Sequence, residues 1–406
     1  MVYQVLACDG VTALYSNTDE NKSHTIEGTG STCVTDILCT TCGQVVLPAT
    51  GHSYTYEAVD GMTHTVGCEA CDYTATESHT YTEGTCICGE AESKEPVVDE
   101  VLVINHSLNL ASDISINFAV RTDYLQGYVN HYMVCEVPVY TGNEQTGTKT
   151  VTLAPVLSGT FYYYTLTGVT AVQMGDVITA QLHMEKNGQP YLSKVDTYSI
   201  AQYAYAQLNK DTTADSLKAL CADLLRYGKE AQIFKTYRTD SLADAAMTEA
   251  HRASLSDLQA VTFGNTNRVL DDLPDAPIAW VGKGLDLDSK VCLKFIFDPV
   301  DFMGDLADLT LRVSYQDVYG DERHLTLTEP LPYDSDRGLY AFTLDTLLAS
   351  ELREVVSVQI FAGETPVSST FQYSADTYGN NKTGKLLTLC KALFAYSDSA
   401  KTYFAP

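Results

Sequence analysis

The chain has too few basic residues for the protein classes that bind negatively charged polymers. Its 406 residues include 25 Lys and Arg against 52 Asp and Glu, which gives a formal net charge of −27 at pH 7. A field of this sign repels phosphate backbones and anionic lipid. No stretch approaches the ~20 apolar residues that a membrane-spanning helix requires. We therefore expect no nucleic-acid partner and no membrane insertion.

Sequence signatures of catalysis are also missing. The nucleophile motif Gly-x-Ser-x-Gly and the metalloprotease motif His-Glu-x-x-His are both absent. The segment 379–385 comes close to a phosphate-binding loop, but Leu386 stands where Ser or Thr would hold magnesium. We expect no catalytic residues, and we interpret the protein as non-enzymatic.

Cysteine is scarce in most of the chain and concentrated at its beginning. Eight of the 12 cysteines precede residue 90, and the other four are Cys135, Cys221, Cys292 and Cys390. A disulfide-stapled secreted protein would distribute its cysteines more evenly. We expect these four late residues to be small buried apolar side chains.

The early cysteines alternate with histidines, mostly two or three residues apart. Thiolates and imidazoles are the ligands that zinc prefers, and a Cys-x-x-Cys turn presents two of them at once. The pattern predicts two structural zinc sites in a module too small for an adequate core. The expected first site consists of Cys33, Cys39, Cys42 and His52; the expected second site consists of Cys68, Cys71, Cys86 and Cys88, with His64 or His79 as substitutes.

Disulfides are the alternative interpretation of this cluster. They would be favoured outside a cell, but residues 33–88 contain seven cysteines, an odd number, and the histidines would have no role. The spacing Cys86-Ile87-Cys88 is also one residue shorter than that of an ideal zinc knuckle. This difference weakens the prediction that the second site is a zinc ribbon made of two knuckles.

The remainder of the chain contains an internal repeat. Alternating apolar residues at 108–118 match those at 285–295 at an offset of 177, and residues 162–182 match 340–360 at an offset of 178. Helical apolar stripes at 217–231 and 386–400 match at an offset of 169. Short alternating strands with polar turns, such as Asn187-Gly188, are typical of antiparallel sandwiches.

These patterns predict a mainly β fold with some α structure. A small zinc-ribbon-like N-terminal module, 1–92, is followed by an acidic linker, 93–100. Two homologous antiparallel β-sandwich modules follow, each ending in a helix, at 101–240 and 280–406, with a helical connector at 241–279. Within the first module we expect helices at 200–208 and 213–234, and another helix at 241–258.

Several segments resemble a family of modular proteins. The stretches 168–180, 196–204 and 220–232 resemble modules of large secreted or cell-surface proteins of gut Clostridia, and Cys39-Thr-Thr-Cys42-Gly43 with Ala49–Tyr54 resembles the Cys/His repeats that accompany them. The resemblance implies an extracellular or cell-surface setting, although we see no secretory signal, since Met1-Val2-Tyr3 runs directly into ordinary polar sequence. It implies a scaffold or adhesion protein that binds a protein or glycan surface partner. The alternatives are a carbohydrate-binding accessory module and an enzyme with a pocket at the junction of the two repeats. A carbohydrate-binding module needs an exposed aromatic platform, and the presence of a single tryptophan, Trp280, argues mildly against it.

Overall fold

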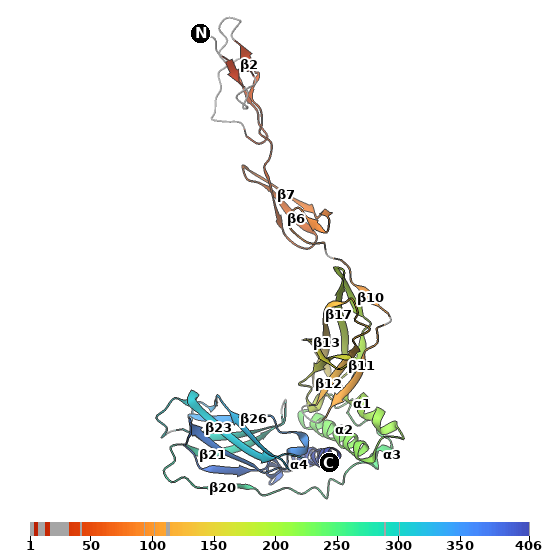
Figure 1. Cartoon of the computed structure of the whole chain (residues 1–406), viewed down its shortest axis with the longest axis vertical. Helices are drawn as coiled ribbons and strands as arrows, with labels where there is room; N and C mark the ends of the chain where they lie inside the picture. The colour runs from red at the N-terminus through yellow and green to blue at the C-terminus, as the bar shows by residue number, and fades with distance from the viewer. Residues whose placement is uncertain are drawn as a thin grey trace. The chain divides into compact units, whose positions relative to one another are not determined.

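The computed structural model describes residues 4–6, 13–16, 32–40, 43–92, 94–100, 102–110, 114–287, 290–299 and 301–405 (Figure 1). The chain divides into two compact units, Met1–Glu95 and Pro96–Pro406. Residues expected to form a linker belong partly to the second unit, because Val97–Asp99 (β10) pairs with a strand of its larger sheet. As the sequence predicts, the fold is mainly β with α-helices.

The first unit consists of short antiparallel pairings. Its central sheet has the order β5-β6-β7, formed by Tyr54–Ala58, Thr63–Cys68 and Cys71–Ser78. Three two-stranded pairings accompany it: β1 (Gln4–Leu6) with β2 (Ala13–Ser16), β3 (Ile37–Leu38) with β4 (Val45–Leu47), and β8 (Tyr81–Thr82) with β9 (Thr85–Cys86). Val46 and Val66 are the only buried aliphatic side chains among residues 32–40, 43–92 and 94–95. So small a core cannot by itself stabilise a unit of this size.

The second unit begins with a sandwich of two sheets. The larger sheet has the order β10-β18-β17-β13-β14, with β19 also paired to β17, and the smaller has the order β11-β12-β16-β15. The strands after β10 are β11 (Asn105–Asn109), β12 (Ser115–Arg121), β13 (Val129–Thr141), β14 (Glu144–Leu153), β15 (Val156–Ser158), β16 (Phe161–Leu166), β17 (Ile178–Lys186), β18 (Gln189–Ser193) and β19 (Asp196–Tyr198). Asn187 and Gly188, with φ of 53° and 69°, form the predicted two-residue turn between β17 and β18.

A second sandwich follows with the same arrangement of central strands. Its sheets have the orders β20-β29-β27-β23-β24, with β28 also paired to β27, and β21-β22-β26-β25. Their strands are β20 (Asn267–Asp271), β21 (Ala279–Asp286), β22 (Cys292–Asp298), β23 (Leu309–Gln316), β24 (Glu322–Leu327), β25 (Leu331–Asp334), β26 (Leu339–Leu344), β27 (Val356–Ala362), β28 (Thr365–Pro366) and β29 (Thr370–Tyr373). The larger sheets of the two sandwiches differ at one edge: the edge strand β10 pairs with β18 in the first, whereas the edge strand β20 pairs with β29 in the second.

The inward faces of these sheets and the helices share one hydrophobic core. Phe118 and Tyr164 of the first sandwich and Phe295 and Phe342 of the second are completely buried. They occupy positions that the repeat pattern aligns at offsets of 177 and 178. The four late cysteines are buried, as expected.

Helices follow the strands of each sandwich. Ile200–Asn209 (α1) begins where expected, because the Ser199 side chain accepts a hydrogen bond from the Gln202 amide. Asp215–Lys235 (α2) starts two residues later than predicted, with Ala214 at its N-cap. The expected helix at 241–258 is wrong in extent: only Glu249–Arg252 (α3) is α-helical there. In the second sandwich Ala375–Gly379 is a 3₁₀ turn (η4), and the chain then forms α4 (Gly384–Phe404). Within the described residues no helix combines the length and apolarity needed to cross a bilayer.

The two sandwiches meet through α2 and α4. The rings of Tyr227 and Tyr396 stack across this contact, with centroids 5.9 Å apart and planes inclined by 7°. Asp223, completely buried on α2, accepts hydrogen bonds from Arg226, from the hydroxyl of Ser256 and from Ser399 of α4, at 2.5, 2.6 and 2.5 Å. One carboxylate therefore connects both helices and the segment between the sandwiches.

A glycine inside α2 allows the helix to approach a neighbouring turn. A Cβ atom at Gly228 would lie 2.8 Å from Met174 Sδ, 3.2 Å from Ala243 Cβ and 3.3 Å from the carbonyl oxygen of Ala171. We expect Gly228→Ala to lower the free energy of unfolding by about 1–3 kcal/mol, although alanine is the better helix former. Denaturant titration followed by Trp280 fluorescence measures this. Gly147→Ala, which meets no atom within 4 Å, serves as the control and should change stability by less than about 0.5 kcal/mol.

Candidate metal centres

The central sheet of the first unit brings histidines and cysteines together at its two ends. Strand β6 begins beside His64 and ends at Cys68, four residues or about 13 Å further along an extended strand. Strand β7 then returns antiparallel from Cys71 toward His79. The structure accordingly forms two clusters able to hold a metal ion, one consisting of Cys33, His52, Cys68 and Cys71, and the other of His64, His79, Cys86 and Cys88.

The first cluster lies at the tip of the β6–β7 hairpin. Cys33 Sγ lies 3.6 Å from Cys68 Sγ, and Cys71 Sγ lies 3.4 Å from His52 Nδ1. The segment that carries Cys33 is held beside the one that carries His52, because the Gly51 amide donates a hydrogen bond to the Cys33 carbonyl at 3.1 Å. The cluster therefore fastens the chain before β3 to the central sheet.

The second cluster lies at the opposite end of the same sheet. The Nδ1 atoms of His64 and His79 lie 3.3 Å apart, Cys86 Sγ lies 3.5 Å from His64 Nδ1, and Cys88 Sγ lies 3.4 Å from His79 Nδ1. The Gly89 amide donates to the Cys86 carbonyl at 2.8 Å, which closes a tight turn around the two cysteines. This cluster fastens the β8–β9 hairpin to the sheet.

These distances match the edges of a tetrahedron around one ion. Bond lengths of about 2.3 Å for zinc–sulfur and about 2.0–2.1 Å for zinc–nitrogen imply ligand–ligand separations of roughly 3.3–3.8 Å, shortest between two nitrogens and longest between two sulfurs. The observed nitrogen–nitrogen, nitrogen–sulfur and sulfur–sulfur contacts follow that order, from 3.3 to 3.6 Å. A disulfide would need sulfurs about 2.05 Å apart. Cys33 and Cys68 are free thiols.

The sulfurs influence one another's protonation. Burial and the sulfurs of Cys68 and Cys71 raise the pKa of Cys33 to about 11. The amide of Ala70, which donates to Cys68 Sγ, lowers the pKa of Cys68 to about 6. Without a cation, one thiol thus ionises readily while its neighbour keeps its proton. Because metal ligation requires thiolates, binding releases protons, and rising pH favours the bound state.

The second cluster shows the same division between its cysteines. Burial opposes ionisation of Cys86, but the Cys88 amide and the His79 ring outweigh it and lower the pKa of Cys86 to about 6. Burial raises the pKa of Cys88. The Asp60 carbonyl raises the pKa of His79 by accepting from its Nε2, 2.8 Å away. With the proton on Nε2, the lone pair of Nδ1 is left to bind a metal ion, an arrangement common in metal-binding histidines.

Tyrosine rings surround the ligand histidines. The His52 ring lies 4.6 Å from Tyr73 and 5.4 Å from Tyr54, and the His79 ring lies 5.6 Å from Tyr81. Both histidines belong to the sequence His-Ser/Thr-Tyr, at 52–54 and 79–81, and the tyrosine of each tripeptide begins a strand, β5 or β8. Ligand spacing does not predict these tyrosines; the repeated tripeptide is the sequence signal for Tyr54 and Tyr81.

The structure groups the predicted ligands differently from the sequence-based expectation. In the first cluster, Cys33 and His52 lie with Cys68 and Cys71. In the second cluster, Cys86 and Cys88 lie with His64 and His79, the two histidines that were expected only as substitutes. Strand β7 is the physical reason, because its eight residues carry the chain from Cys71 to the far end of the sheet before Cys86 is reached. Cys39 lies in neither cluster and forms a turn in which its carbonyl accepts from the Gly43 amide at 2.9 Å, while Cys42 lies outside the described residues.

Comparison of the chain with protein-family models and with curated proteins finds no match.

Proposed function

We propose that both clusters hold structural zinc. Thiolate and imidazole are the donors that zinc prefers, and four protein ligands leave no open position for a reacting water. The observation that carries this proposal is the pairing of two four-ligand clusters with a unit whose described part buries only Val46 and Val66 among its aliphatic side chains. The ions would supply the cross-links that so small a core lacks.

Cobalt substitution tests the ligand sets one at a time. Refolded with Co²⁺, the chain should develop sulfur-to-cobalt absorption, and Cys68→Ser and Cys86→Ser should each lose one equivalent of bound metal relative to the parent chain. Cys292→Ser, at a buried cysteine of the second unit, is the control and should retain the full metal content. Equal metal content in the parent and in both ligand variants would contradict the assignment.

We further propose that the whole chain is a non-catalytic extracellular or cell-surface scaffold or adhesion protein of a gut bacterium. The resemblance to modular secreted proteins, the net charge of −27 and the lack of catalytic motifs support this. The shared order of the central strands further supports descent of the two sandwiches from one duplicated module. Its partner would be a protein or glycan on a host or bacterial surface.

A binding screen of the full chain tests the adhesive role. Immobilised host-surface glycoproteins and arrayed glycans serve as the probes, and we expect saturable binding without chemical change of the bound molecule. Turnover of a captured glycan would identify an enzyme instead, and a screen without saturable binding would remove the adhesive role.

Carbohydrate binding is the second candidate, and one surface of the first sandwich favours it. The rings of Tyr132 and His183 stack with centroids 5.1 Å apart beside a depression that Tyr191 and Asn130 also line. Tyr132 is 40% exposed, and partly exposed tyrosine rings can stack on sugar rings. In the glycan array, Tyr132→Ala should abolish binding if this surface is the site, whereas Tyr319→Ala, at an exposed tyrosine of the second sandwich, should not.

A further inference from the structure

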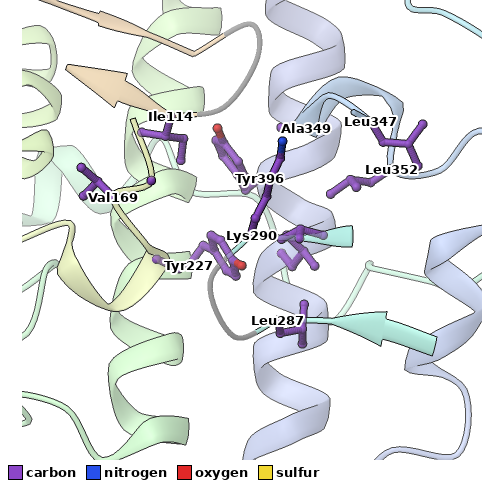
Figure 2. A pocket seen from close by; sticks show the side chains of 13 residues that line it. Ile114, Val169, Tyr227, Leu287, Lys290, Leu347, Ala349, Leu352 and Tyr396 are labelled. Carbon is purple, nitrogen blue, oxygen red and sulfur yellow. The ribbon is translucent and has the colours of Figure 1, made fainter. Parts of the chain in front are cut away.

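A small pocket lies where the two sandwiches meet at α2 and α4 (Figure 2). Its walls come from both halves, largely at positions that the repeat pattern aligns. The corresponding pairs are Ile114 with Val291, Val169 with Leu347, Ala171 with Ala349, and Tyr227 with Tyr396. The stacked tyrosines belong to α2 and α4, so the pocket depends on the contact between the sandwiches.

The size and lining of the pocket suit an apolar group. The volume is about 110 Å³, and aliphatic side chains such as Leu287, Leu352 and Leu393 form most of the wall. A cavity of about 150 Å³ lined by apolar side chains stays dry and admits benzene. This pocket is smaller than that cavity, so it accepts at most one small ring or a short branched chain, and not a sugar or a nucleotide.

Two polar groups distinguish the pocket from a packing void. Tyr396 is 2% exposed, and its hydroxyl has no hydrogen-bond partner among the residues that the structure describes. Buried hydroxyls without partners are rare in folded proteins. The Lys290 side chain, 36% exposed, also lines the pocket and lies 3.7 Å from Asp345. In the view of Figure 2, Lys290 runs along the pocket, and its nitrogen and the Tyr396 hydroxyl lie toward the same end.

We propose that the pocket binds a small carboxylic acid with an aromatic or branched apolar body. The apolar body fills the space against the two tyrosine rings and the leucines. The carboxylate accepts a hydrogen bond from the Tyr396 hydroxyl and pairs with the Lys290 ammonium, which is the combination of partners that a carboxylate requires when it leaves water. All lining residues belong to the second unit, whereas the metal clusters consist of residues of the first unit.

Ligand-detected NMR on the full chain tests the proposal with benzoate and with its uncharged analogue benzamide. Benzoate should bind saturably. Lys290→Gln should weaken benzoate about tenfold and benzamide much less, because only benzoate carries the charge. Tyr396→Phe should weaken both probes, because both offer an oxygen to the hydroxyl.

A substitution that fills the pocket with a larger side chain gives the most direct test. Ala349→Leu, on the 3₁₀ helix Ala349–Glu351 (η3), should abolish binding of both probes; Ala307→Leu, on the exposed 3₁₀ helix Leu306–Asp308 (η2), should leave it unchanged. Circular dichroism checks that each variant is folded. Absence of saturable benzoate binding to the parent chain would overturn the proposal. Unchanged binding to folded Ala349→Leu and Lys290→Gln would do the same.

Discussion

Removal of metal should unfold the first unit and leave the second intact. A strong zinc chelator at neutral pH takes away the cross-links at both ends of the β5-β6-β7 sheet, and the remaining core of the described residues is too small to replace them. Structural zinc sites contribute about 10–16 kcal/mol of apparent binding free energy, so the expected effect is complete loss of this fold.

Limited proteolysis with mass spectrometry locates the effect. After chelation, cleavage sites should concentrate before Glu95, while the fluorescence of Trp280, the only tryptophan of the chain, reports an unchanged second unit. Restoring Zn²⁺ should restore protection, and Mg²⁺, which prefers oxygen ligands, should not. Persistent protection of the first unit in a sample that elemental analysis finds free of metal would refute the structural role.

Loss of the Asp223 carboxylate should strongly destabilise the second unit. Asp223→Ala leaves the Arg226 guanidinium buried without its ion-pair partner and deprives the hydroxyls of Ser256 and Ser399 of their acceptor. Breaking a buried ion pair by removing one partner typically costs about 3–5 kcal/mol. Burial already lowers the pKa of Arg226, while Asp223 opposes that shift, so the arginine depends on this carboxylate.

Denaturant titration followed by Trp280 fluorescence measures the change, because this tryptophan lies in the second sandwich. Asp215→Ala on the same helix is the matched control: this exposed residue lies in the first turn of α2 and should cost no more than about 1 kcal/mol. If the two variants were equally stable, Asp223 would not connect the sandwiches energetically.

Much of the second unit is predictable from its sequence because its strands alternate strongly. Leu108, Ile116 and Phe118 recur at a constant offset as Leu285, Leu293 and Phe295, and both sets lie on paired strands. The Asn187-Gly188 turn fixes its hairpin through backbone conformations that few other residues adopt. The segment 241–258 is less predictable. Its apolar residues Leu242, Ala246, Ala250 and Ala253 recur every three or four positions, as in a helix, but many of its hydrogen bonds close isolated turns, such as that from the Ala245 amide to the Leu242 carbonyl.

The sequence predicts that cysteines and histidines are the ligands, but not which of them share one site. Cysteine and histidine spacing identifies short turns such as Cys68–Cys71, because two thiols must lie close together there. Grouping the turns requires knowing how many residues the strands between them contain and in which direction each strand runs. The eight residues of β7 decide which ligands meet, and its sequence, Cys-Asp-Tyr-Thr-Ala-Thr-Glu-Ser, contains no large aliphatic residue to indicate an unbroken strand.

The single core that runs through α2 and α4 has a consequence for cleavage of the backbone. If a protease cut the connecting segment after α3, each fragment would keep an apolar helical stripe that fits the other fragment. The Tyr227–Tyr396 stack and the Asp223–Ser399 hydrogen bond would still join the two pieces. A nicked molecule would therefore migrate as one particle until a denaturant separated its parts.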